Sequence, residues 1–189
     1  QFVALDSDQA EALTSAQVAA LTQAQIAAIA SENLAAFSTD DVAAISLLAL
    51  MGMTTDNVAS LGSDKIVALK TTQIMGLRTT QIAALTSDQV GVLTSAQLGA
   101  LTTSQVAALS TDGLAGLTTD QIPSLKTASV AALTSTQLDA LNTDQVAALT
   151  TSQIAAMTTA QVSVLSTDQL AVVTTGQIGA LSSTQVAAL

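Results

Sequence analysis

The side chains that could do chemistry in this sequence are almost all carboxylates. The 189 residues include fourteen Asp or Glu and four Lys or Arg, with no Cys, His, Trp or Tyr. Cys or His nucleophiles, Cys or His metal sites, disulfides and aromatic platforms for nucleic acid are therefore excluded. The net charge of -10 has the wrong sign for phosphate backbones or anionic lipid, so we expect no nucleic-acid partner.

The carboxylates do not form a recognisable site. Calcium sites need closely spaced acids that converge on one ion, and the only close pairs are Asp6 with Asp8 and Asp40 with Asp41. No acid has the distinctive neighbourhood that a pair of glycosidase carboxylates would need. Gly176 to Gly179 lacks the Lys of a phosphate-binding loop. We therefore predict no catalytic, cofactor-binding or metal-binding residues, no cofactor, and no enzyme activity.

The acids instead follow a repeat of eight residues. Ten of the fourteen occupy the same position of an octad: Asp8, Glu32, Asp40, Asp56, Asp64, Asp88, Asp112, Asp120, Asp144 and Asp168. Counting from Leu149 as position one to Ala156 as position eight, they occupy position four. Positions one and six, from Phe2 onward, are apolar in 24 of 24 copies, and position five is Gln in 17 of 24. We predict one uninterrupted repeat array over residues 1–189.

Each octad carries the signals of a short helix. Thr or Ser at position two can serve as the N-cap and Gln at position five can reach back, which makes a capping box. Acids at position four lie in the first turn, where the helix dipole favours negative charge. Four apolar positions in succession argue against alternating strands. The sequence therefore predicts an all-α solenoid with one helix per octad, and a β-solenoid is the alternative.

The octad also predicts which positions are buried. Positions three, six and the next position one share a helical face, so we expect a core there, with the small hydroxyl of position three beside it. Positions two and seven should face solvent, and the small residues at position eight should allow close backbone approach. Pro123 should distort its helix. The octad from Ile45 to Gly52, with Leu47 and Leu48, should expose extra apolar surface.

The spacing of the acids favours three octads, and so three helices, per coil. Seven pairs of position-four acids lie three octads apart, and one lies two octads apart. A helical hairpin of two octads per coil is the alternative. A cap at position three rather than two also stays open, because position three is Ser or Thr in 21 of 23 copies.

The octads Thr102 to Leu109 and Thr150 to Met157 resemble repeat tracts of very large secreted or cell-surface bacterial proteins of the adhesin or exoprotein type. The resemblance implies an extracellular structural role and assigns no functional residue. No apolar run is long enough to span a membrane, and no signal peptide is visible.

Uncapped repeats at both ends lead us to expect a rod, filament, sheath or stalk whose partner is a further copy of itself. The alternative is an adhesin or ligand-binding module with contacts to a cell surface or glycans. A cluster of Lys65, Lys70 and Arg78 on one face would favour that alternative.

Overall fold

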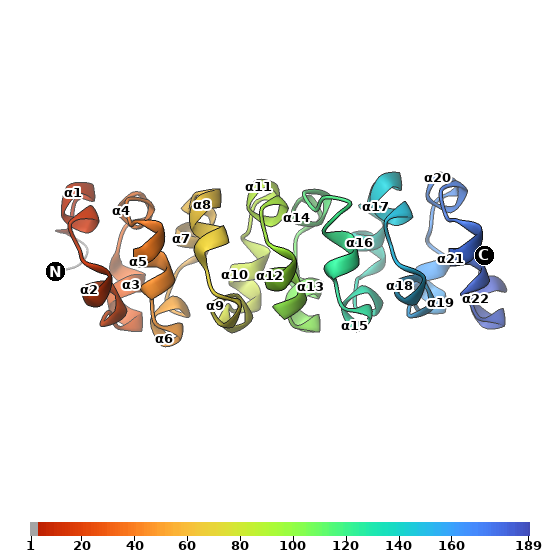
Figure 1. Cartoon of the computed structure of the whole chain (residues 1–189), viewed down its shortest axis with the longest axis horizontal. Coiled ribbons are helices and arrows are strands. Elements are labelled where there is room, and N and C mark those ends of the chain that lie inside the picture. Colours follow the sequence, from red (N-terminus) through yellow and green to blue (C-terminus); the bar gives the residue numbers. More distant parts are fainter. Residues whose placement is uncertain (1–3) are drawn as a thin grey trace.

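A computed structural model describes residues 4–189, so the core position predicted for Phe2 lies outside the described residues. Within residues 4–189 the structure contains 22 α-helices of four to six residues and no strand (Figure 1). The predicted all-α solenoid is confirmed, and the β-solenoid alternative is wrong. Helices this short are marginal in isolation, so packing against neighbouring helices has to stabilise them.

The helices follow one another at intervals of about one octad. Their bounds are α1 (Ser7–Glu11), α2 (Ser15–Ala19), α3 (Gln23–Ala28), α4 (Ser31–Ala35), α5 (Thr39–Ala44), α6 (Leu47–Leu50), α7 (Thr55–Ser60), α8 (Ser63–Ala68), α9 (Thr71–Gly76), α10 (Thr79–Ala83), α11 (Ser87–Gly91), α12 (Ser95–Ala100), α13 (Thr103–Ala108), α14 (Thr111–Ala115), η2 (Ile122–Ser124), α15 (Thr127–Ala131), α16 (Ser135–Asp139), α17 (Thr143–Ala147), α18 (Thr151–Ala155), α19 (Thr159–Val162), α20 (Thr167–Ala171), α21 (Thr175–Gly179) and α22 (Ser183–Val186).

Each α-helix begins at position three, so the N-cap is position two. At α13 the Thr102 hydroxyl accepts from the Gln105 backbone N–H at 3.2 Å, and Gln105 Oε1 accepts from the Thr102 N–H at 2.9 Å. This is the predicted capping box in the predicted register. Only five of the 22 helices lack the side-chain cap. Their N-cap residues are Ala30, Gly62, Lys70, Arg78 and Lys126.

Pro123 changes its octad as predicted. The octad that begins at Leu117 holds only the short 3-10 helix η2 instead of an α-helix. Proline has no N–H for an α-helical bond, and its ring collides with the carbonyl of the preceding turn. Ile122 is nevertheless fully buried, so this octad keeps its place in the core.

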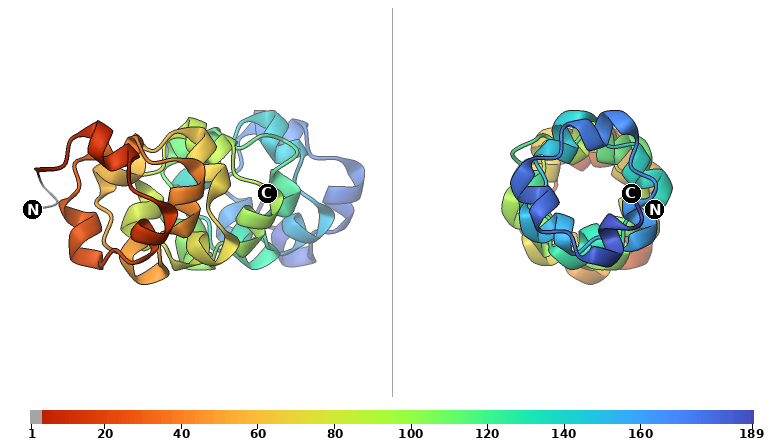
Figure 2. Two further views of the ribbon diagram at one scale, coloured as in Figure 1. Left: turned by 60° about the vertical axis from the view of Figure 1, so that its left-hand side comes forward. Right: turned by 90° about the vertical axis from the view of Figure 1, so that its right-hand side faces the viewer.

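Helices three octads apart stack on one another along the long axis. The contacts pair α2 with α5, α11 with α14 and α15 with α18, which confirms the coil of three octads against the hairpin of two. The stack also twists. Along the upper edge in Figure 1, α4 is followed by α8 rather than by its stacking partner α7. Seen along the axis in Figure 2, the helices surround a common centre.

Positions one and six fill that centre. Leu101 and Val106, for example, are fully buried, and one continuous cluster of buried side chains extends from Ala10 to Val162. Position eight allows the close backbone approach that its small residues predicted. A Cβ atom added at Gly52 or Gly116 would collide with the carbonyl oxygen of a residue in the preceding coil.

The prediction for position three is wrong. Thr103 and most of the other threonines at this position are exposed and none of them is buried, whereas Gln105 at position five is buried. On a helical wheel the two positions lie at similar angles, about 90° and 70° from the inward direction, so the wheel does not separate them. The glutamine is buried because it finds hydrogen-bond partners in the preceding coil.

Candidate functional surfaces

A row of buried glutamines joins each coil to the one before it, and we call it the glutamine ladder. In each member, Nε2 donates to the carbonyl oxygen of the position-one residue 28 positions earlier, at 2.5–2.9 Å. The ladder consists of Gln73, Gln81, Gln89, Gln97, Gln105, Gln121, Gln137, Gln145, Gln153, Gln161, Gln169, Gln177 and Gln185.

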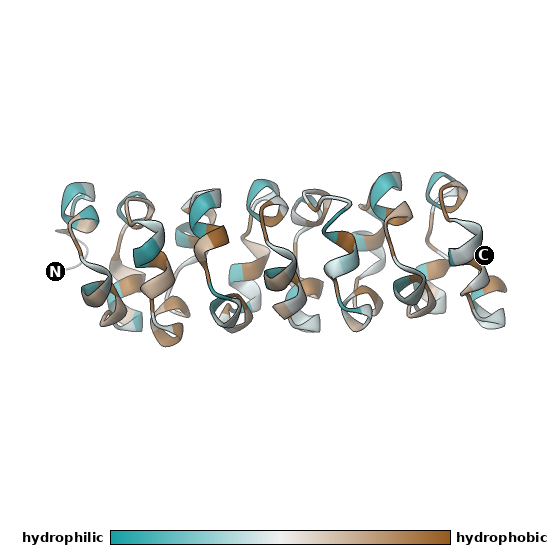
Figure 3. Cartoon of the chain, in the orientation of Figure 1, coloured by the Kyte–Doolittle hydropathy of each residue, from teal (hydrophilic) through white to brown (hydrophobic). Residues whose placement is uncertain are grey.

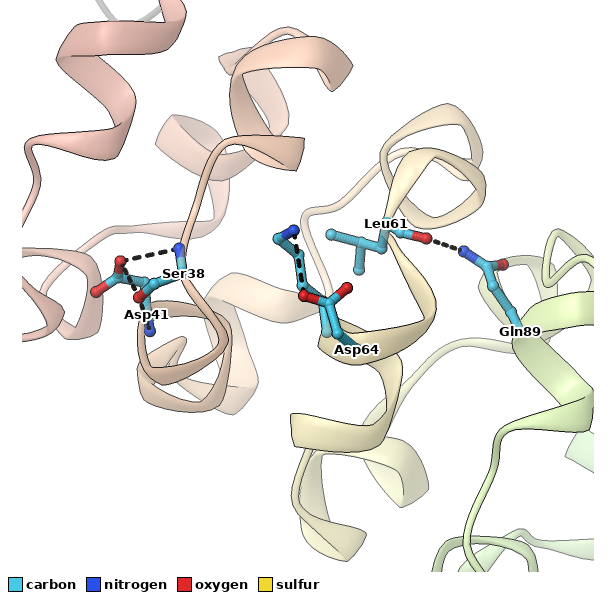
Figure 4. Close-up of polar contacts among 6 residues, drawn as sticks. Ser38, Asp41, Leu61, Asp64 and Gln89 are labelled. Atoms are coloured by element: carbon cyan, nitrogen blue, oxygen red, sulfur yellow. Dashed lines mark hydrogen bonds and ion pairs between the residues drawn. The ribbon is translucent and has the colours of Figure 1, made fainter.

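Gln89 shows how one side chain serves two helices. Its Oε1 accepts from the N-cap N–H of Thr86, at the start of its own helix α11. Its Nε2 donates to the carbonyl oxygens of Leu61 and Val58, at the end of α7 in the preceding coil (Figure 4). The last carbonyls of a helix lack partners within the helix. The glutamine therefore satisfies an N-terminus and a C-terminus with one buried amide.

The ladder is interrupted where position five is not an amide. At Ser129 the hydroxyl is buried and has no hydrogen-bond partner among the described residues. The carbonyl of Leu101, which a glutamine at position 129 would reach, accepts instead from Nζ of Lys126 at 3.2 Å. Lys126 is the position-two residue of the same octad, so one unusual residue compensates in part for the other.

Asp41 replaces the glutamine near the N-terminal end of the ladder. Its carboxylate accepts from the hydroxyl and the N–H of Ser38 (Figure 4). It also accepts from the hydroxyl of Ser15 in the preceding coil, at 2.7 Å. Burial by itself raises the pKa of Asp41, but these hydrogen bonds outweigh it and hold the pKa below the ordinary value. At Asp41 the preceding coil therefore supplies the donor and position five supplies the acceptor, which is the reverse of the glutamine ladder.

Seven of the ten position-four acids lie along one side of the molecule. The helices along the upper edge in Figure 1 are α1, α4, α8, α11, α14, α17 and α20. Each has an acid at position four: Asp8, Glu32, Asp64, Asp88, Asp112, Asp144 and Asp168. We call this row the acidic edge; in Figure 3 most of its helices are coloured as hydrophilic. An open groove of about 770 Å³ lies on it between α8, α11 and α14.

Helices without acids line the opposite side. The lower edge in Figure 1 includes α6, α9, α13, α15 and α22, and none of these helices contains Asp or Glu. We call this row the acid-free edge. The predicted apolar exposure of the octad with Leu47 and Leu48 is confirmed on α6, where the two side chains are 46% and 66% exposed.

The close acidic pairs have separate structural roles. Asp6 is the N-cap of α1 and accepts from the Gln9 N–H at 2.8 Å, whereas Asp8 is exposed in the first turn. Asp40 is exposed while Asp41 is buried. Within residues 4–189 no group of three or more acidic side chains is arranged to hold a metal ion.

The basic residues do not form the cluster that would favour a binding module. Lys65 lies within α8 and pairs with Asp64 at 3.8 Å (Figure 4), and because the Asp64 side chain is 64% exposed the pair contributes little. Lys70 and Arg78 begin the successive helices α9 and α10, which lie at successive corners of the coil. Arg78 Nη2 donates to the carbonyl of Met53 in the preceding coil.

Sequence reasoning recognised the capping role of glutamine but missed its second role. Position five contains no Glu at all, although Glu serves in a capping box as well as Gln. A side chain that must accept at one end and donate at the other has to be an amide. The use of Gln and never Glu at position five was therefore the sequence feature that could have predicted the glutamine ladder.

These features define an α-helical solenoid of short, glutamine-linked repeats. The chain belongs to the ALTTAQ repeat family, whose model matches residues 63–95, 91–127, 124–151 and 147–175. The six residues in the family's name, Ala-Leu-Thr-Thr-Ala-Gln, correspond to position eight of one octad followed by positions one to five of the next. Residues 148–153 match them except at Ser152. No curated protein matches the chain. No helix among residues 4–189 is long and apolar enough to cross a membrane.

Proposed function

We propose that the chain is a structural module that forms a rod by the stacking of coils and that it serves outside the cell in a filament, sheath or stalk. Its membership of a repeat family indicates a repeat-based structural module. The glutamine ladder is the observation that carries the proposal. Each coil presents carbonyl groups on one side and glutamine amides on the other, so any further coil finds the same partners.

The proposal includes stacking between copies. In the first coil Gln17 is exposed, and Nε2 of Gln17 has no acceptor among residues 4–189. A coil that precedes it, from further repeats or from a second copy, would supply carbonyls as Leu61 does for Gln89. Apolar side chains are also exposed in the last coil, where Ile178 and Val186 occupy the core position six. Stacking would bury them.

Two further points support a structural role outside the cell. The chain has no cysteine that oxidation could damage, and its repeats resemble those of secreted and cell-surface bacterial proteins. Asp6 and Asp41 take part in capping boxes, and within residues 4–189 no group of three or more acidic side chains could hold a metal ion. We propose no enzymatic activity.

Electron microscopy of the purified chain tests the rod. We expect particles whose length increases in steps of one chain as the concentration is raised. The variant Gln17→Glu, which keeps the cap acceptor but removes the donor, should limit the particles to the length of one chain. Wild-type particles of single length at every concentration would contradict stacking between copies. Protease treatment of intact source cells tests the location, and a fully protected chain would contradict it.

A further inference from the structure

The seven acids of the acidic edge follow the twist of the stack, whereas Asp40, Asp56 and Asp120 belong to octads outside this edge. Along the acidic edge, Asp8, Glu32, Asp64, Asp88 and Asp112 are separated by three, four, three and three octads. The step of four octads falls between α4 and α8, where the stacking partner α7 has turned away from the upper edge. A second step of four octads, to Asp144, falls between α14 and α17. The longer steps keep the acids on one side.

Helix capping does not account for this arrangement. An acid at position four gains the same favourable interaction with the dipole of every helix. Yet the acid-free edge has Leu48, Thr72, Ser104, Ala128 and Thr184 at position four. The absence of acids there is therefore a property of the outer surface and not of the helix starts.

The acid-free edge also has strongly exposed apolar side chains. Leu48 on α6 is 66% exposed and Met75 on α9 is 51% exposed, and α6 stacks directly on α9. Leu47 lies over Gly76 of α9, where an added Cβ would collide with the leucine side chain. Figure 3 shows α6 as a hydrophobic segment at the lower rim. Together these side chains form an apolar patch that we define as Leu47, Leu48 and Met75.

We infer that the acid-free edge is a docking surface for a second copy of this chain, paired edge to edge about a two-fold axis through the apolar patch. Each copy has a net charge of -10, so two copies repel wherever their carboxylates meet. The acid-free edges can meet while both acidic edges stay in water. Pairing also removes Leu48 and Met75 from water, which supplies the driving force.

The pairing goes beyond the proposed stacking, because it widens the rod and does not lengthen it. A two-fold interface uses the same patch on both copies and closes at the dimer. Stacking through the glutamine ladder is open-ended. Particle width and particle length therefore report separately on the two proposals, and either can fail while the other holds.

Sedimentation equilibrium of the full chain tests the pairing, with three aspartate variants that all also carry Gln17→Glu, so that stacking between copies does not add to the mass. Leu48→Asp and Thr72→Asp place a carboxylate on the acid-free edge, whereas the control Thr136→Asp places one on α16. All three residues are exposed and occupy position four, so the gain from the helix dipole is matched. Circular dichroism confirms that each variant is folded.

With stacking blocked by Gln17→Glu, we expect the chain with an unchanged acid-free edge to reach twice the mass of one chain, which is 18.8 kDa. Leu48→Asp and Thr72→Asp should each raise the dimer dissociation constant about tenfold or more, because like charges then face each other across the axis. Thr136→Asp should leave it within a factor of about two, since surface changes remote from a contact cost little.

Three results would overturn the inference. One is a chain with Gln17→Glu alone that stays monomeric from micromolar to millimolar concentration. Another is a control variant Thr136→Asp that weakens association as much as Leu48→Asp. The third is dissociation of the dimer at 1 M salt, where the Debye length falls to about 3 Å. Contacts between apolar side chains should persist at this salt concentration, whereas pairs of acidic and basic side chains should be screened and separate.

Discussion

The side-chain amide of Gln89 lies 2.7 Å from the carbonyl oxygen of Leu61, 28 residues earlier in the chain. This bond joins the start of one helix to the end of a helix in the preceding coil. Because the same relationship recurs along the stack, each octad adds a similar interface. The stability of such a solenoid depends on contacts between neighbouring repeats. The first prediction concerns this bond.

Gln89→Glu should lower the free energy of unfolding by about 2–4 kcal/mol, because a buried carboxylate then faces two carbonyl oxygens without a donor between them. The matched control is Gln17→Glu, which makes the same change where the side chain is exposed. The control should stay within about 0.5 kcal/mol. Urea unfolding followed by circular dichroism measures both. Equal losses in the two variants would show that only the cap matters.

The second prediction concerns the caps. Thr102→Ala should cost about 1 kcal/mol, because it removes the acceptor of the Gln105 N–H. Thr103→Ala should be close to neutral, since Thr103 is exposed. Both variants can be compared by thermal unfolding under identical conditions. A larger loss for Thr103→Ala would place the functional cap one residue later.

Much of this fold could be predicted from the octad, because capping, amphipathic pattern and helix dipole act within a few residues. The N-cap at Thr102, the break at Pro123 and the exposure of Leu48 all follow from local chemistry. The burial of Gln105 could not be derived in the same way, because its partners Ile74 and Leu77 lie in another coil, 31 and 28 positions earlier. The acidic edge could not be predicted for a related reason. Which octads face the same side of the molecule depends on the twist of the stack, and no single octad specifies that twist.

The third prediction concerns the core. Leu101→Ala should cost about 2–5 kcal/mol, because the leucine is fully buried and its removal leaves a cavity between coils. Leu48→Ala removes the same number of atoms from an exposed side chain and should change the stability of the monomer by less than about 0.5 kcal/mol. Hydrogen exchange should show faster opening in the octads that contact Leu101. A uniform loss of protection along the whole chain would contradict local coupling.

The fourth prediction is a repair of the ladder. Ser129→Gln should raise the free energy of unfolding by about 1 kcal/mol, because the amide can accept from the Lys126 N–H and donate to the carbonyl of Leu101, while the unpaired hydroxyl disappears. Ala128→Gln, at the exposed neighbouring position, is the control and should have little effect. Urea unfolding compares the two. Destabilisation by Ser129→Gln would mean that the space beside Lys126 is too small for the amide.

The last prediction concerns the pH dependence at Asp41. Its pKa is held below the ordinary value because the hydrogen bonds from Ser38 and Ser15 outweigh the opposing effect of burial. The hydrogen bonds therefore stabilise the ionised Asp41 carboxylate more in the folded chain than in the unfolded chain. Its stabilisation is fully present above the unfolded pKa of about 3.9 and is lost as the pH falls through the folded pKa.

Comparison with Asp41→Asn isolates this contribution from that of the other carboxylates. The difference in unfolding free energy between wild type and variant should be constant from pH 7 to about pH 5 and should shrink below about pH 4. Asp40→Asn is the control, because Asp40 is exposed in the first turn of the same helix. Its difference curve should vary less with pH. A difference for Asp41→Asn that grows on acidification would show that the carboxyl group is bound in its protonated form.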